Sequence, residues 1–124
     1  MLKGSCLCGA VTWRTDAAPR NSVACHCSQC RKTSGHYWSA TQVPSDALTI
    51  AGTAHLRWFQ SSEKARRGFC DTCGSNLFWE KGGEGMISIG SGTIDGATGL
   101  TTAQHIFCAF KGDYYDIEDG PVQR

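Results

Sequence analysis

The sequence contains no long apolar segment and carries almost no net charge. Hydrophobic residues make up 40% of its 124 residues, yet no run approaches the roughly 18 residues of a membrane-spanning helix. This excludes a transmembrane helix and predicts a soluble globular chain, which at this length forms a single domain over residues 1–124. The formal net charge of +1 gives no general attraction to nucleic acid or anionic membranes. We therefore expect neither a membrane nor a nucleic acid as partner.

The N-terminal segment lacks the apolar core of a secretory signal peptide. The chain reaches Cys6 before such a core could fit, so we expect a cytoplasmic protein in a reducing compartment. Disulfides do not persist in such a compartment. The eight cysteines are therefore better explained as metal ligands than as a disulfide framework.

Three of these cysteines, Cys25, Cys27 and Cys30, form a CxCxxC pattern. The spacing suits a disulfide poorly, because a bridge requires defined Cα distances and would leave one thiol over. Zinc accepts thiolates in tetrahedral geometry, and a catalytic zinc has three protein ligands and a fourth position for water or substrate. The alternative is a closed structural site whose fourth ligand is Cys108 or a histidine. The pattern alone does not decide between the open and the closed site.

A second metal site is predicted from two cysteine pairs that lie far apart in the sequence. Cys70 and Cys73 form a CxxCG knuckle, whose tight turn directs two sulfurs to one point. Cys6 and Cys8 also need two partners, and joining the pairs gives a closed four-cysteine zinc site that can supply about 10 kcal/mol of folding free energy. Sharing one pair with the CxCxxC group is the competing assignment, but it leaves the other pair without partners. Cys108 belongs to neither pattern and is expected to be buried and inert.

Alternation of apolar and polar residues, bounded by turn residues, predicts a mainly β protein with little helix. The expected strands cover residues 4–13, 22–24, 36–43, 48–50, 55–60, 66–69, 75–79, 86–92 and 105–110. Residues 29–34 are expected to form one or two helical turns that end at Gly35. Arg31 and Lys32 lie in this helix and are candidates for binding an anionic substrate. A solvated face is the plainer interpretation of two adjacent basic residues.

Four segments together resemble the glutathione-dependent formaldehyde-activating enzyme family, also called the centromere-protein-V-like family. These segments are GSCLCGAV (4–11), CHCSQCRKTSG (25–35), FCDTCGSNLFW (69–79) and QHIF (104–107). The resemblance implies an Mss4-like fold of zinc-bound antiparallel sheets, a β-tent. It also implies two zinc ions per chain, with the second site partly occupied. The structural zinc would be held by Cys6, Cys8, Cys70 and Cys73, and the catalytic zinc by Cys25, Cys27 and Cys30.

The resemblance further implies a carbon–sulfur lyase similar to S-(hydroxymethyl)glutathione synthase. Its substrates would be glutathione and formaldehyde, or a related thiol and small aldehyde, and Arg31 or Lys32 could hold a carboxylate of the thiol. The alternative is a zinc-stabilised binding module without turnover that presents a surface to a protein or nucleic acid. A third hypothesis is redox sensing by the central cysteines, because clustered thiolates oxidise readily when metal leaves.

Overall fold

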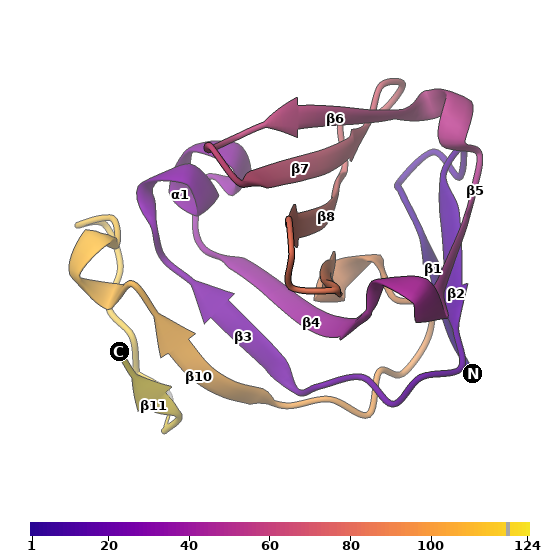
Figure 1. The fold of residues 1–124 in the computed structure, drawn as a ribbon. Helices are drawn as coiled ribbons and strands as arrows, with labels where there is room; N and C mark the ends of the chain where they lie inside the picture. The colour runs from indigo at the N-terminus through magenta and orange to yellow at the C-terminus, as the bar shows by residue number, and fades with distance from the viewer. Residues whose placement is uncertain (119) are drawn as a thin grey trace.

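The computed structural model describes residues 1–118 and 120–124, and in these residues the chain is mainly β-structure (Figure 1). The strands are β1 (Leu2–Ser5), β2 (Thr12–Thr15), β3 (Ser22–Cys25), β4 (Trp38–Pro44), β5 (Leu48–Ala51), β6 (Leu56–Gln60), β7 (Ala65–Cys70), β8 (Asn76–Lys81), β9 (Met86–Gly90), β10 (Thr102–Ile106) and β11 (Val122–Gln123). The one α-helix among the described residues, α1, covers Ser28–Ser34. Short 3-10 turns occupy Ser45–Ala47, Thr53–His55, Ser91–Thr93 and Cys108–Phe110. The predicted mainly β fold with little helix is confirmed.

Two sheets organise the chain. The small sheet has the order β1-β2-β5, and the large sheet has the order β11-β10-β3-β4-β9-β8-β7-β6. All neighbouring pairs are antiparallel except those of β10, which runs parallel to β3 and to β11. In Figure 1 the large sheet curves from β10, β3 and β4 round to β7 and β6, and α1 and the small sheet lie on opposite sides. The predicted antiparallel arrangement therefore holds except at β10.

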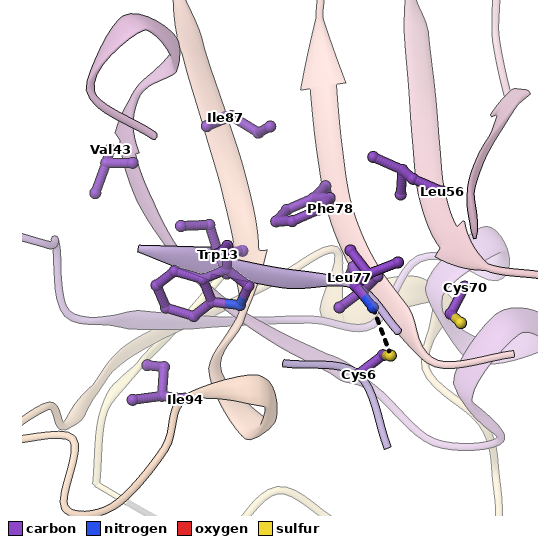
Figure 2. Packing of buried hydrophobic residues seen from close by; sticks show 11 residues of the cluster. Cys6, Trp13, Val43, Leu56, Cys70, Leu77, Phe78, Ile87 and Ile94 are labelled. Carbon is purple, nitrogen blue, oxygen red and sulfur yellow. Dashed lines mark hydrogen bonds between the residues drawn. The ribbon is translucent and has the colours of Figure 1, made fainter. Parts of the chain in front are cut away.

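The hydrophobic core lies between the small sheet and one face of the large sheet. Side chains alternate along a strand, so Ile87 of β9 and Phe78 of β8 point into the core while Ser88 and Trp79 line a cavity on the opposite face. Figure 2 shows Trp13 of β2 directed toward the same interior. The buried cluster comprises Cys6, Val11, Trp13, Val43, Leu56, Cys70, Leu77, Phe78, Ile87, Ile89 and Ile94. This shared core supports our proposal that residues 1–124 form one domain.

Strand β1 approaches the core closely at Gly4. A Cβ at this position would lie 2.1 Å from the carbonyl oxygen of Thr93 and 2.6 Å from the ring of Trp13. The Trp13 ring is itself fixed, because its Nε1 donates to Thr93 Oγ1 at 3.1 Å. Only glycine therefore allows β1 to pack here and to deliver Cys6 to the edge of the core.

The predicted continuous strand over residues 4–13 is wrong. Strand β1 ends at Ser5 and β2 begins at Thr12, and the residues between them form a turn. The Cys6 N–H donates to the Val11 carbonyl at 3.0 Å, and Gly9, with φ of 81°, donates to the Cys6 carbonyl at 3.2 Å. A residue in the left-handed region cannot continue a strand, so the chain turns back instead.

The last part of the chain also departs from the prediction. The strand expected over residues 105–110 is displaced to β10, and Phe107, with φ of 55°, ends it. Strand β11 was not predicted, because two residues carry no periodic signal.

The longest described helix, α1, has seven residues, so none of the described helices could span a membrane.

Candidate active site

Two turns bring four cysteines together at one edge of the core. Cys6 and Cys8 come from the turn between β1 and β2, Cys70 is the last residue of β7, and Cys73 lies in the turn between β7 and β8. All four sulfurs lie within 4.8 Å of one another. The Sγ atoms of Cys6 and Cys8 are 3.7 Å apart, as are those of Cys8 and Cys70. Thiolates at about 2.3 Å around a tetrahedral zinc would be separated by about 3.8 Å. The four-thiol group, as predicted, therefore has the dimensions of a metal site.

Hydrogen bonds from residues around the four-thiol group favour the thiolates of Cys6 and Cys73. The Val11 N–H donates to Cys6 Sγ at 3.3 Å. The hydroxyl of Ser75, 3.2 Å from Cys73 Sγ, is the largest cause that lowers the pKa of Cys73 to about 5. The pKa of Cys8 is raised to about 12: a backbone hydrogen bond lowers it, but desolvation and the neighbouring sulfurs outweigh that effect. The four thiols thus share protons that a bound cation would displace.

The other three cysteines lie where β3 ends and α1 begins. Cys25 is the last residue of β3, Cys27 is the N-cap of α1, and Cys30 is buried within the helix; their sulfurs also lie within 4.8 Å of one another. The Cys27 Sγ accepts the Cys30 N–H at 3.3 Å. Gly35, with φ of 82°, ends the helix and donates to the Arg31 carbonyl at 2.8 Å. The predicted helix and its glycine stop are confirmed.

Arg67 of β7 contacts this three-thiol group. Its Nη2 donates to Cys30 Sγ at 3.5 Å and its Nε donates to Gln29 Oε1 at 3.1 Å, while Gln29 Nε2 donates to the Ser61 carbonyl at 3.0 Å. The hydrogen bond with Cys25 is the largest cause that lowers the pKa of Cys30 to about 6, and the charge of Arg67 lowers it further against the effect of burial. The pKa of Cys25 is raised, because its thiol is hydrogen-bonded to Cys30 and desolvated.

A cavity of about 360 Å³ opens beside the three thiols, a size within the usual range of ligand pockets. Its floor is the face of the large sheet opposite the core, so residues of β3, β4, β7, β8 and β9 contribute to it. The lining is mostly apolar but includes two guanidinium groups. The lining residues are Arg20, Val23, Cys25, Cys27, Gln29, Cys30, Trp38, Ala40, Gln42, Ser62, Ala65, Arg67, Trp79, Ser88, Ile106 and Phe107.

Arg31 and Lys32, the substrate-binding candidates from the sequence, do not line this cavity. Both lie in the last turn of α1, where Arg31 is half-buried and Lys32 is exposed. Their part in substrate binding stays a prediction. Arg67 was not predicted as a site residue, because no local pattern separates it from Arg66, whose Nη2 pairs with Glu80 Oε1 at 2.7 Å.

A closed site at the three-thiol group would need Cys108 or a histidine as its fourth ligand. Within residues 1–118 and 120–124 no fourth cysteine, histidine or carboxylate joins it. His26 is fully buried, and its ring nitrogens lie 2.6 Å from the Tyr115 hydroxyl and 2.9 Å from His105 Nδ1. Cys108 is outside both groups and only partly buried, so the expectation that it is buried is wrong.

Comparison with known proteins shows which family the chain matches and which solved structure shares its fold. The family model described as glutathione-dependent formaldehyde-activating enzyme matches residues 1–110. A Halomonas elongata protein named for glutathione-dependent formaldehyde activation is 36% identical over 86 residues, which span 63% of this chain but only 55% of that protein. An uncharacterized lyase of Schizosaccharomyces pombe is 27% identical over 119 residues, 93% of this chain and 84% of the lyase. The crystal structure of a Rhodobacter sphaeroides protein aligns with a TM-score of 0.67 at 24% identity, covering 78% of this chain and 91% of that one, which shows the shared fold.

Proposed function

The chain belongs to the glutathione-dependent formaldehyde-activating enzyme family, and we propose that it is a zinc-dependent enzyme of the carbon–sulfur lyase type. In this proposal it forms or cleaves the adduct of glutathione, or a related thiol, with formaldehyde. The observation that carries the proposal is the three-thiol group, Cys25, Cys27 and Cys30, which lines a cavity and has no fourth protein ligand among the described residues. A closed, purely structural site would have a fourth protein ligand and would need no cavity beside it.

The donor sets support zinc in both cysteine groups. Thiolates are soft ligands that suit zinc, and four of them enclose the ion while three leave one position accessible. In the proposed assignment Cys6, Cys8, Cys70 and Cys73 hold a structural ion, and Cys25, Cys27 and Cys30 hold a catalytic one. When bound at the second group, zinc would supply Lewis acidity and a coordination position for the sulfur of the substrate.

The side chains around the three thiols would keep this group in one geometry. Gln29 is anchored to the Ser61 carbonyl and accepts from Arg67, so the Arg67 guanidinium is directed at Cys30. Its positive charge stabilises Cys30 as a thiolate. The indole rings of Trp38 and Trp79 form apolar walls that exclude water from the bound thiol.

The reaction is an addition without oxidation or reduction. The thiol sulfur forms a bond to the aldehyde carbon, the carbonyl π bond breaks, and the proton lost by the thiol ends on the new hydroxyl oxygen. Cleavage runs the same steps in reverse. Formaldehyde has two heavy atoms, so nearly all of the cavity of about 360 Å³ is available to the thiol.

Exchange NMR of glutathione and formaldehyde tests this proposal. We expect zinc-replete protein to accelerate exchange between free glutathione and its hydroxymethyl adduct, and we expect Cys27→Ser to remove the acceleration. A Cys108→Ser variant is the matched control, because Cys108 belongs to neither thiol group. If wild-type protein with two bound zinc ions leaves the exchange rate unchanged, the enzymatic proposal fails and a zinc-stabilised binding module becomes the better explanation.

Cytoplasmic location is part of the same proposal, and fractionation of cells tests it.

A further inference from the structure

The cavity extends away from the three thiols along β3 and β4. Cys25 and Val23 of β3 line it, and their register partners on β4, Trp38 and Ala40, line it beside them. The chain before β3 brings a further lining residue, Arg20, to the cavity. At a rise of about 3.3 Å per residue, the five residues from Arg20 to Cys25 span about 16 Å if extended. The thiols and Arg20 therefore lie at separate ends of the cavity.

The backbone at Arg20 is firmly held. Its N–H donates to the Gln42 carbonyl at 3.3 Å, and its carbonyl accepts the Thr41 hydroxyl at 2.5 Å. Thr41 is fully buried in β4, so this attachment is part of the sheet rather than of a loose loop. The direction in which the Arg20 side chain enters the cavity is therefore fixed at its base.

The guanidinium of Arg20 has almost no partner of its own. Its one hydrogen bond runs from Nη1 to the Asn21 carbonyl at a long 3.4 Å, and it forms no ion pair with any residue in 1–118 or 120–124. Arg57 and Arg66, by contrast, pair with carboxylates. Burial lowers the pKa of Arg20, although an arginine remains protonated in proteins. A half-buried cation whose N–H donors are mostly unused favours an anionic ligand.

We infer that Arg20 binds a carboxylate of the thiol substrate and so selects acidic, peptide-sized thiols over small or neutral ones. This inference rests on the proposed function and adds a specificity-determining residue to it. The planar guanidinium presents parallel N–H groups that match the two oxygens of a carboxylate. Gln42 Nε2, which donates to Ser88 Oγ at 3.2 Å, lies at the same end and provides a second polar group.

The dimensions of the cavity agree with a peptidic thiol. A tripeptide reaches about 10 Å when extended, and an arginine side chain is long enough to cover the rest of the span of about 16 Å. A thiol of three or four heavy atoms cannot contact the three-thiol group and Arg20 at once. Arg67 is not available for the same role, because Cys30 and Gln29 already engage it.

Binding of S-methylglutathione separates this inference from catalysis, because the compound keeps both carboxylates but has no thiol to react. We expect titration calorimetry to show that Arg20→Gln weakens its binding about tenfold to hundredfold, the range of a charge-assisted hydrogen bond. The diester of the same compound should bind wild type and variant equally weakly. Arg14→Gln is the matched control, since Arg14 is exposed on β2 of the small sheet, and its affinity should equal that of wild type. Equal affinity of folded Arg20→Gln and wild type, or no binding to wild type at millimolar concentration, overturns the inference.

Kinetics provide the second readout. In the exchange assay Arg20→Gln should raise KM for glutathione about tenfold or more with kcat within about twofold, because the lost contact is remote from the reacting atoms. Arg20→Lys keeps the positive charge but not the paired N–H groups of the guanidinium, so its KM should lie between those of wild type and Arg20→Gln. If Arg20→Gln does not fold, an unchanged KM in Arg20→Lys overturns the inference. A larger KM effect from Arg31→Gln or Lys32→Gln than from Arg20→Gln overturns it in favour of the helix residues. Arg20-dependent binding without any exchange activity would reject the proposed enzyme and retain the anion site.

Discussion

Cys70→Ser should destabilise the fold, whereas Cys27→Ser should leave the chain folded and remove its activity. Cys70 is fully buried in the core cluster, and in the proposed structural site it would, with Cys6, Cys8 and Cys73, link the small sheet to the end of β7 in the large sheet. Loss of this ligand would leave three thiols that bind metal poorly and would release the link between the two sheets. The Cys27 thiol, by contrast, belongs to a local segment of α1.

The magnitudes follow from the loops that each metal site closes. If the four-thiol site is treated as a cross-link, the 62-residue separation of Cys8 and Cys70 gives about 4 kcal/mol of chain entropy. For the five-residue separation of Cys25 and Cys30 the same expression gives about 2 kcal/mol, and β3 and α1 already fix much of that segment. Serine is also a preferred N-cap, so Cys27→Ser keeps the start of α1.

We therefore expect Cys70→Ser to lower Tm by about 10–20 °C or to prevent soluble expression, since 1 kcal/mol shifts Tm by about 3–5 °C at this size. Cys27→Ser should stay within about 5 °C of wild type, retain one zinc and lose thiol-adduct activity. Circular dichroism melts and zinc analysis on both variants, with Cys108→Ser as control, measure these effects. If Cys27→Ser unfolds the chain while Cys70→Ser remains folded and active, the structural and catalytic assignments are reversed.

Three further predictions follow from the same geometry. A mild chelator should remove zinc in two stages, first from the open three-thiol group and then from the closed group with loss of fold; release of both ions in one step would count against two unequal sites. In protein that retains only the tight zinc, Arg67→Gln should raise the pKa of Cys30 above about 6, because a cation that favours the thiolate is removed. The pH dependence of Cys30 alkylation measures this, and an unchanged profile would show that Arg67 does not act on the thiol. Leu77→Ala should cost about 3 kcal/mol, since Leu77 is fully buried in the core; urea unfolding measures it, and a cost below about 1 kcal/mol would mean that the core there is loosely packed.

Local signals explain what the sequence predicted well. The CxxCG and CxCxxC patterns each bring sulfurs together within a few residues, so their geometry depends little on the rest of the fold. Helical turns over residues 29–34 were predicted from the run before Gly35. The helix covers Ser28–Ser34, and Gly35 follows it in the left-handed conformation as expected. The strands expected over residues 75–79 and 86–92 were also predicted from local composition, because a glycine-rich segment separates two alternating runs, and they form β8 and β9.

The cavity could not be predicted, because strand register creates it. Arg67 lies 37 residues from Cys30 in the sequence and reaches it only because β7 pairs with β8, with Trp79 opposite Arg67. Arg20 lies between the strands expected over residues 4–13 and 22–24, and nothing local shows that its backbone is bound to β4. The turn between β1 and β2 was missed for a similar reason, since alternation over residues 4–13 resembles a strand until Gly9 is seen in the left-handed region.

The parallel pairing of β10 with β3 explains why a motif at residues 104–107 belongs to a site built on residues 25–30. Parallel strands end at the same edge of a sheet, and the register pairs Ile106 with Cys25, the last residues of β10 and β3. The chain therefore leaves β10 beside the three thiols, where Ile106 and Phe107 line the cavity. His105, one residue earlier, faces away and contacts the buried His26. In an antiparallel pairing the start of β10, not its end, would lie at this edge, so the departure of β10 from the predicted antiparallel pairing is what completes the cavity wall.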